Sequence, residues 1–327
     1  MITAEGHQLG LHWSCYGPKY LDSYLIQNVE HPAINPQSVL TRAFVVDRLV
    51  SARFETIIED ELLFAACACH ALQQHSKGRL SELLKCIQQE PPHAELPRFL
   101  SPDFLSRQRC HIDLKQLIMT LGACITLGFD WMQSPFEKIW SRALADIKPA
   151  GERMLEVGCG SANDYRFWDR YGIARLIDYT GIDVCATNVS NAQTRFPNAR
   201  FRLGDACSID EADGTFKVVF CFDLLEHLSE QAIGAAMSEF ERLSQDEIWI
   251  STFNAGPFAN HQIRPVDGYH WNTLSLCELS QHLNDAGFAP EIVSVSAELE
   301  RRFCGYHHYN QNAYILIGRR HAIVGNS

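Results

Sequence analysis

The chain has 327 residues, a formal net charge of −11 at pH 7 and a hydrophobic share of 46%. That length is enough for one α/β domain and a sizeable extension. The acidic balance argues against a protein that binds the phosphates of nucleic acid, because such binding depends on many Lys and Arg side chains. Small molecules are therefore the expected partners, and no nucleic acid is expected.

The twelve cysteines stand mostly in apolar stretches and form no Cys-x-x-Cys pair with zinc spacing. They are interpreted as buried, reduced thiols of a cytosolic protein. The first residues lack the basic start and apolar block of an export signal, and no apolar run approaches the roughly twenty residues that span a bilayer. A cytoplasmic protein without membrane contact is therefore expected.

Residues 1–148 are predicted to be mainly helical, because apolar residues recur there with helical spacing and polar caps followed by proline mark several helix starts. One such start is a capping box formed by Ser134 and Glu137. The Cys67, Cys69 and His70 cluster lies in an apolar helix and is assigned to the core. The predicted helices are 39–50, 54–75, 80–89, 112–127 and 135–147.

Residues 149–327 change to short apolar runs that alternate with helical segments, which is typical of a mostly parallel sheet covered by helices on both faces. No helical pattern joins the last two runs, so the final strand is predicted to be antiparallel to its neighbours. The predicted strands are 153–157, 179–184, 200–203, 217–222, 248–252, 291–296 and 313–317. The predicted helices are 162–171, 189–195, 230–243 and 274–286.

The turn Gly158-Cys159-Gly160 joins the first strand of this region to its first helix. Glycine permits a close approach by a ligand, and the turn places backbone amides and the positive end of a helix at the strand tip. Short glycine motifs are weak by themselves, but a position after a strand and before a helix favours a binding site.

Two ligand classes compete for this turn, the dinucleotides and S-adenosylmethionine. A dinucleotide site needs a third glycine where the chain has Asn163, and the Asp164 that follows would repel a pyrophosphate. Glu156, just before the turn, also suits a ligand that carries an amine. The sequence therefore favours S-adenosylmethionine.

Residues 152–320 resemble the class I S-adenosylmethionine-dependent methyltransferases, particularly the enzymes that act on small molecules. The matching segments lie at the strand ends, although Ala162 stands where the family commonly has a third glycine. These segments are Leu155-Glu156-Val157-Gly158-Cys159-Gly160, Gly181-Ile182-Asp183, Gly204-Asp205-Ala206, Asp223-Leu224-Leu225-Glu226-His227 and Asp285-Ala286-Gly287-Phe288. The resemblance implies a Rossmann-like fold of seven strands and the cofactor S-adenosyl-L-methionine.

The resemblance also implies roles for individual residues. Asp183 would accept the ribose hydroxyls, unless it caps the following helix. Asp205 would take the adenine amino group beside the amide of Ala206, unless it is a solvated turn acid. Glu156 would face the methionine amine, unless it pairs with a local Lys or Arg. The other residues expected at the cofactor are Tyr16, Tyr20, Gly158, Cys159, Gly160, Val184, Phe222 and Asp223, of which Val184 and Phe222 flank the adenine or belong to the core.

The acceptor is expected at the carboxyl ends of the strands, beside residues 252–254 and two loops at 259–271 and 305–312. A general base would be a histidine, and the candidates are His227, His270 and His308, with Tyr306 lining the same mouth. Each histidine has a structural alternative, a helix cap for His227 and a surface position for the other two. Asp223, Glu226 and His227 resemble metal ligands of a few relatives, but no second acid-histidine pair follows, and no metal is assigned.

The expected reaction is methyl transfer to an oxygen or nitrogen of a small metabolite. Two alternatives stay open. In one, the same cofactor loses its aminocarboxypropyl arm and methylthioadenosine is released. In the other, the chain is a regulatory protein that binds the cofactor without turnover. The helices of 1–148 are expected to form a lid over the site or a homodimer surface.

Overall fold

The structure is a computed structural model, and it describes residues 151–170, 174–266, 269–297 and 310–321. The helices predicted within 1–148 lie outside these ranges and stay predictions.

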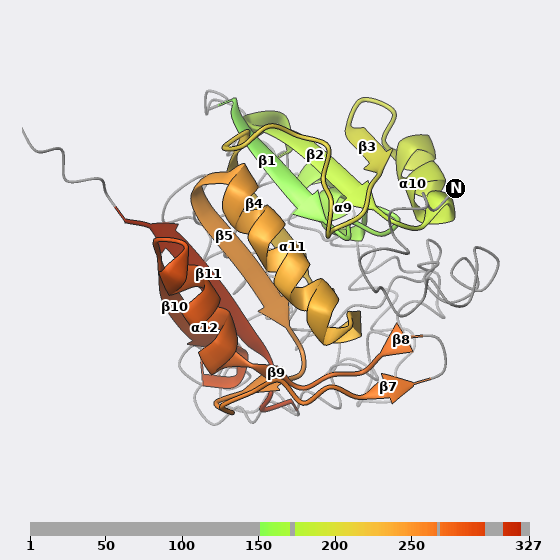
Figure 1. The fold of residues 1–327 in the computed structure, drawn as a ribbon. Coiled ribbons are helices and arrows are strands. Elements are labelled where there is room, and N and C mark those ends of the chain that lie inside the picture. The colour runs from blue at the N-terminus through green and yellow to red at the C-terminus, as the bar shows by residue number, and fades with distance from the viewer. Residues whose placement is uncertain (1–150, 171–173, 267–268, 298–309, 322–327) are drawn as a thin grey trace, which may run out of the picture.

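The described residues form one sheet of seven strands in the order β10-β11-β5-β4-β1-β2-β3 (Figure 1). The strands are β1 (Glu152–Val157), β2 (Ile177–Asp183), β3 (Arg200–Leu203), β4 (Phe216–Phe222), β5 (Ser244–Thr252), β10 (Phe288–Ser294) and β11 (Tyr314–Arg320). From β5 through β4, β1 and β2 to β3 all neighbours are parallel, whereas β11 is antiparallel to both β5 and β10. The predicted Rossmann-like sheet with an antiparallel last strand is confirmed.

The helices of this region match the predicted ones to within about three residues. They are α9 (Asn163–Arg170), α10 (Ala186–Arg195), α11 (Glu230–Leu243) and α12 (Leu276–Asp285), with short 3-10 helices η3 (Ala174–Leu176) and η4 (Leu225–His227). Two small sheets were not predicted. They pair β6 (Ala255–Gly256) with β9 (Leu274–Ser275), and β7 (Pro265–Val266) with β8 (Tyr269–His270).

Helices α11 and α12 cover one face of the sheet (Figure 1). Each begins at a serine cap: the Ser229 hydroxyl accepts a hydrogen bond from the Ala232 amide, and the Ser275 hydroxyl accepts one from the Glu278 amide. Such caps satisfy amides that have no partner inside the helix, and each stabilises its helix by about 1 kcal/mol.

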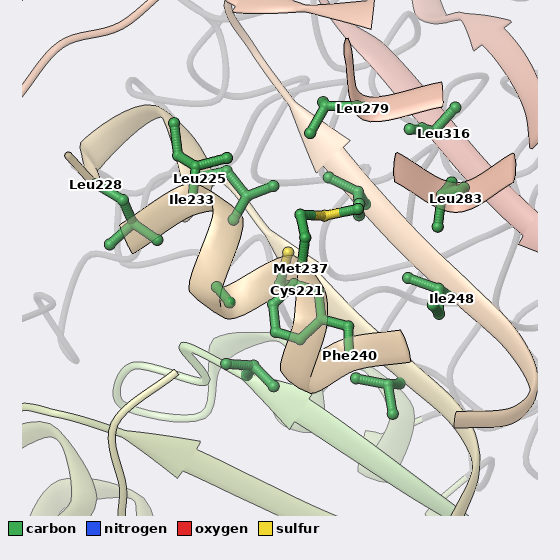
Figure 2. Packing of buried hydrophobic residues seen from close by; sticks show 14 of the residues in the cluster. Cys221, Leu225, Leu228, Ile233, Met237, Phe240, Ile248, Leu279, Leu283 and Leu316 are labelled. Atoms are coloured by element: carbon green, nitrogen blue, oxygen red, sulfur yellow. The ribbon is translucent and has the colours of Figure 1, made fainter. Parts of the chain in front are cut away.

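The apolar side of α11 is the centre of the main core (Figure 2). Met237 and Phe240 point from this helix toward the sheet, and both are fully buried. Leu279 and Leu283 of α12 extend the same layer toward Leu316 of β11. Full burial of one such side chain contributes about 1.5–3 kcal/mol, so this layer holds β4, β5 and β11 in place beneath the helices.

Aromatic rings fill the opposite face. Trp168 of α9 is fully buried, and its ring centroid lies 5.6 Å from that of Tyr179 and 5.2 Å from that of Phe220. Tyr179 also contacts Phe201 of β3 at 5.5 Å. These contacts link α9 with β2, β3 and β4, and β1 pairs with both β2 and β4, so the carboxyl ends of these parallel strands meet at one edge of the sheet. In the part of the chain that the structure describes, no helix is long and apolar enough to cross a membrane.

Candidate active site

The glycine turn after β1 has the backbone conformation that its sequence predicts. Gly158 and Gly160 have φ values of +80° and +53°, and Ala162 also lies in the left-handed region at +65°. The position where relatives commonly carry a third glycine therefore keeps the glycine conformation, although an alanine occupies it. For a non-glycine residue this conformation stores about 1–2 kcal/mol of strain.

The amides of the turn are used within the protein, contrary to the expectation that they face a ligand. The amides of Gly158 and Cys159 donate to the Ile182 carbonyl at 2.8 and 2.9 Å. The Gly160 amide donates to Asp183 Oδ2 at 2.8 Å. The reason is that β2 ends directly beside the turn and brings acceptors to each amide. What the turn offers a ligand is space and a fixed shape.

Asp183 holds this shape from the end of β2. Besides the Gly160 amide, its carboxylate accepts the Cys185 amide at 2.8 Å and the Asn188 side-chain amide at 3.3 Å. The cap position of α10 is Cys185, so Asp183 is not the cap residue of this helix. Burial raises the pKa of Asp183, and the hydrogen bonds from Cys185 and Gly160 act against that rise.

The Asp183 side chain can still bind a ligand. A carboxylate offers about four lone-pair sites, and the described donors occupy three of them. The residue keeps 8% of its surface exposed, at the strand edge. One oxygen can therefore accept a hydroxyl from a bound molecule.

Asp205 follows β3 and stands next to this site. The Gly204 amide donates to the Asp183 carbonyl at 3.0 Å, which ties the ends of β2 and β3 together. Asp205 Oδ1 accepts the Cys207 amide at 2.9 Å, and burial raises the pKa of the carboxyl. Asp205 and the neighbouring Ala206 are both partly buried. The structure therefore places them beside Asp183 in a local turn that is only partly open to solvent.

Glu156 is buried in β1, with 1% of its surface exposed. Its carboxylate accepts the Tyr179 hydroxyl at 2.5 Å. Burial and the neighbouring Glu156 charge raise the pKa of Tyr179. Val184 and Phe222, at the ends of β2 and β4, are both partly exposed, and they stand on either side of the strand that leads into the turn.

Asp223 directly follows β4 and is strained. Its φ is +53°, and its amide donates to the Ser251 carbonyl of β5 at 3.0 Å. Residues held in this region are concentrated at active sites, so the outlier supports a function for this strand end. Leu224, the next residue, lies against the glycine turn: a Cβ added to Gly158 would stand 3.3 Å from its methyl groups.

His227 is oriented by a backbone contact. Its Nδ1 lies 3.2 Å from the His270 carbonyl oxygen. Because a carbonyl only accepts, this hydrogen bond requires the hydrogen on Nδ1, and the Nε2 of the neutral ring is then free to accept a proton. His270 supplies this carbonyl, and the residue is buried with 4% of its surface exposed, so the alternative of a surface position is wrong.

Three further rings surround His227, and together the four rings form what we call the aromatic wall: His227, Phe253, Tyr269 and Trp271. The centroid of the His227 ring lies 5.7 Å from Phe253, 6.0 Å from Tyr269 and 5.6 Å from Trp271. Trp271 in turn lies 5.2 Å from Phe253 and 6.3 Å from Tyr269. Sequence reasoning placed these segments on one side of the sheet without predicting that their rings meet.

Glu226 is the site residue whose role the sequence did not reveal. It is fully buried, and its Oε1 accepts the Thr252 hydroxyl and, at 2.8 Å, the Phe253 amide. Its Oε2 is buried without a hydrogen-bond partner among the described residues. Burial raises the pKa of the Glu226 carboxyl, and His227 acts against that rise. Among the described residues, no three His, Cys, Asp or Glu side chains stand close enough to hold a metal ion.

Four of the residues predicted for the site, Tyr16, Tyr20, Tyr306 and His308, lie outside the described residues. The remaining predicted residues are brought to the ends of β1, β2, β3 and β4 and to η4 and β8.

Part of the chain is similar to known methyltransferases. A family model described as a methyltransferase domain matches residues 154–247. A probable S-adenosylmethionine-dependent methyltransferase of Mycolicibacterium smegmatis is 30% identical over 148 residues, which are 43% of this chain and 54% of that protein. The 27-O-demethylrifamycin SV methyltransferase of Amycolatopsis mediterranei is 27% identical over 162 residues, 45% of this chain and 58% of that protein.

The chain thus spans about half the length of the curated relatives it matches. Among solved structures, the 1,6-didemethyltoxoflavin-N1-methyltransferase of Burkholderia thailandensis, with bound 1,6-didemethyltoxoflavin and S-adenosylhomocysteine, is 18% identical. The match covers 62% of this chain and 83% of that one, with a TM-score of 0.40.

Proposed function

We propose that the chain is a class I S-adenosylmethionine-dependent methyltransferase and that it transfers the methyl group of this cofactor to an oxygen or nitrogen of a small molecule. The observation that carries the proposal is the meeting of two parts at one sheet edge. One part is the Asp183-braced glycine turn, and the other is a histidine oriented as a base.

The residues at this edge suit the cofactor. Gly158 leaves no room for a side chain beside Leu224, and Asp183 retains an oxygen for a ribose hydroxyl. The first turn of α9 carries Asp164, which opposes a phosphate at that helix end and favours a ligand without a pyrophosphate. The described residues therefore fit S-adenosylmethionine better than a dinucleotide.

Each strand end has a role in this proposal. Asp183 binds the ribose, and Asp205 with the Ala206 amide binds the adenine edge, while Val184 and Phe222 lie against the adenine faces. Glu156, behind the turn, attracts the positively charged amine of the methionine part. Gly158, Cys159 and Gly160 shape the turn, and the backbone of Asp223 closes the site on the side of β4.

Bound S-adenosylmethionine supplies an electrophilic methyl group on a positively charged sulfur. The protein positions the acceptor and removes its proton. His227 is the base: its Nδ1 stays bonded to the His270 carbonyl, and its Nε2 accepts the proton from the acceptor oxygen or nitrogen. Since the reaction is a direct displacement, most of the rate enhancement comes from holding the acceptor in line and excluding water.

Analysis of the spent cofactor tests this proposal against both alternatives. Methyl transfer leaves S-adenosylhomocysteine, whereas loss of the aminocarboxypropyl arm leaves methylthioadenosine, and a regulatory protein leaves the cofactor intact. The chain is incubated with S-adenosylmethionine and a metabolite panel, and the products are identified by mass spectrometry. Methylthioadenosine as the main product, or tight binding with no turnover across the panel, contradicts methyl transfer.

A further inference from the structure

The aromatic wall is assembled from three segments that are distant in sequence. His227 ends η4, Phe253 follows β5, and Tyr269 and Trp271 belong to β8 and the residue after it. Trp271 is 41% exposed, and the other three rings are partly exposed. A large ring that stays this exposed while it contacts three others contributes less to folding than a core residue does. It is available to a ligand.

Buried polar groups hold the three segments together beneath the wall. Glu226 fixes the Phe253 amide at 2.8 Å with its side chain, and its backbone carbonyl accepts the Asn272 amide at 2.9 Å. The Asn272 side chain is fully buried and donates to the Leu228 carbonyl at 2.6 Å. These hydrogen bonds anchor Phe253 and Asn272, the residue after Trp271, so the rings of the wall have fixed positions. Fixed positions are what a recognition surface requires.

The wall adjoins the cofactor turn through one residue. The side chain of Leu224 packs against Gly158, and its carbonyl accepts the His227 amide at 3.0 Å. A molecule bound to the aromatic wall is thus next to His227, and Leu224 lies between it and the glycine turn.

We propose that the aromatic wall is the acceptor subsite and that the acceptor is a planar aromatic compound whose hydroxyl or ring N–H group faces Nε2 of His227. This inference rests on the proposed function. The acceptor ring lies against Trp271, and its O–H or N–H proton passes to His227. The oxygen or nitrogen lone pair then forms the bond to the methyl carbon, and the electrons of the broken carbon–sulfur bond stay on sulfur.

The geometry of the wall favours a flat ring over a compact cation. Recognition of an ammonium group uses rings arranged as a cage around an empty centre. Here the rings contact one another directly, at centroid separations of 5.2–6.3 Å and interplanar angles of 42–82°, so they form a packed, non-planar surface without such a centre. A planar molecule stacked on that surface gains aromatic contact in addition to apolar burial.

Matched pairs of small probes test the inference without requiring turnover. The pairs are phenol and cyclohexanol, and 2-naphthol and decahydro-2-naphthol. Each probe is titrated by calorimetry into the full chain saturated with S-adenosylhomocysteine. The variants are Trp271→Leu, which keeps apolar bulk, and Trp271→Phe, which keeps a ring. Phe258→Ala is the control, because Phe258 is also 41% exposed but has no contact with the wall among the described rings.

The wild-type chain is expected to bind the aromatic member of at least one pair about three- to tenfold more tightly than the saturated member. Trp271→Leu abolishes this preference, Trp271→Phe restores most of it, and Phe258→Ala leaves it unchanged. Equal binding within every pair, or no binding of any aromatic probe, overturns the inference. So does an equal effect of Phe258→Ala and Trp271→Leu.

The same titrations distinguish failure of the aromatic subsite from failure of the proposed methyl transfer. If the chain ignores S-adenosylhomocysteine, the titrations are repeated without it, and a preference that depends on Trp271 then supports an aromatic subsite in a protein that is not a methyltransferase. If the chain methylates only saturated acceptors, the proposed function stands and the aromatic acceptor is refuted.

Discussion

Substitution of Gly181 by alanine should destabilise the domain by about 1–2 kcal/mol. A Cβ at this position would stand 2.7 Å from the Tyr179 hydroxyl, 2.9 Å from Phe201 Cδ1 and 3.0 Å from Cys159 Cβ. None of these neighbours can move freely, because the Tyr179 hydroxyl donates to Glu156 and the other two side chains are at most 5% exposed. Overpacking of this kind costs about 1–3 kcal/mol, and a smaller unfolded-state entropy offsets about 0.4–1 kcal/mol of it.

Gly234→Ala is the matched control. Gly234 lies inside α11, and nothing stands within 4 Å of the position that its Cβ would take. The same substitution should therefore stabilise the protein there by about 0.5–1 kcal/mol, since alanine is the better helix former. Each variant adds one methyl group to the wild-type protein, yet the two effects on stability should have opposite signs.

Urea unfolding followed by tryptophan fluorescence measures both effects, because Trp168 is buried beside Tyr179. The midpoint should fall for Gly181→Ala and rise for Gly234→Ala at an unchanged slope. Since the displaced Cys159 belongs to the glycine turn, Gly181→Ala should also weaken the binding of S-adenosylhomocysteine, and Gly234→Ala should not. A Gly181→Ala protein with wild-type stability and affinity would refute the packing described for β2.

Three further substitutions test separate features by urea unfolding. Ala162→Gly should leave the free energy of unfolding unchanged or raise it by up to about 1 kcal/mol, because glycine relieves the strain of a φ of +65°. Ala192→Gly, inside α10, should lower the free energy of unfolding by about 1 kcal/mol. Equal losses for the two variants would contradict strain at Ala162. Glu226→Ala should lose about 1–3 kcal/mol by depriving the Phe253 amide of its acceptor, and Glu226→Gln should lose less because it keeps an oxygen there. Burial and the charge of Asp285 raise the pKa of Glu241 to about 7. The folded protein holds that proton more tightly than the unfolded chain, so stability falls as the pH rises from about 4.5 to 7. Glu241→Gln should therefore gain about 1 kcal/mol over the wild type at pH 8 and almost nothing at pH 4, after allowance for its partial exposure; a gain that does not vary with pH would refute the assignment.

The central sheet could be predicted from the sequence because its strands are short apolar runs separated by amphipathic helices. The strand ends were less predictable. β5 begins at Ser244, four residues before the predicted start, since its first four residues are polar, with Gln245 and Asp246 exposed, but this end of the strand pairs with β4 through its backbone. β10 contains Pro290, which a sheet accepts because this strand lies at its edge.

The position of the proposed cofactor residues at the strand ends was predictable for a related reason. Its residues stand at strand ends, and the order of parallel strands brings those ends together. The aromatic wall depends on contacts that no local pattern encodes. Glu226 meets Thr252 and Phe253, which are 26 and 27 residues away, and its burial became visible only in three dimensions. For the same reason the contact between the His270 carbonyl and His227 could not be predicted from the sequence.

Calorimetric titration of S-adenosylmethionine into the full chain and into an Asp183→Ala variant tests the central claim most directly. Circular dichroism first establishes that the variant is folded, and NAD serves as the competing ligand. The wild-type chain should bind S-adenosylmethionine and ignore NAD, and the variant should bind roughly ten- to a hundredfold more weakly, as expected when a charged hydrogen-bond acceptor is removed. Preference for NAD, or an affinity for S-adenosylmethionine that does not change without the Asp183 carboxylate, would contradict the account.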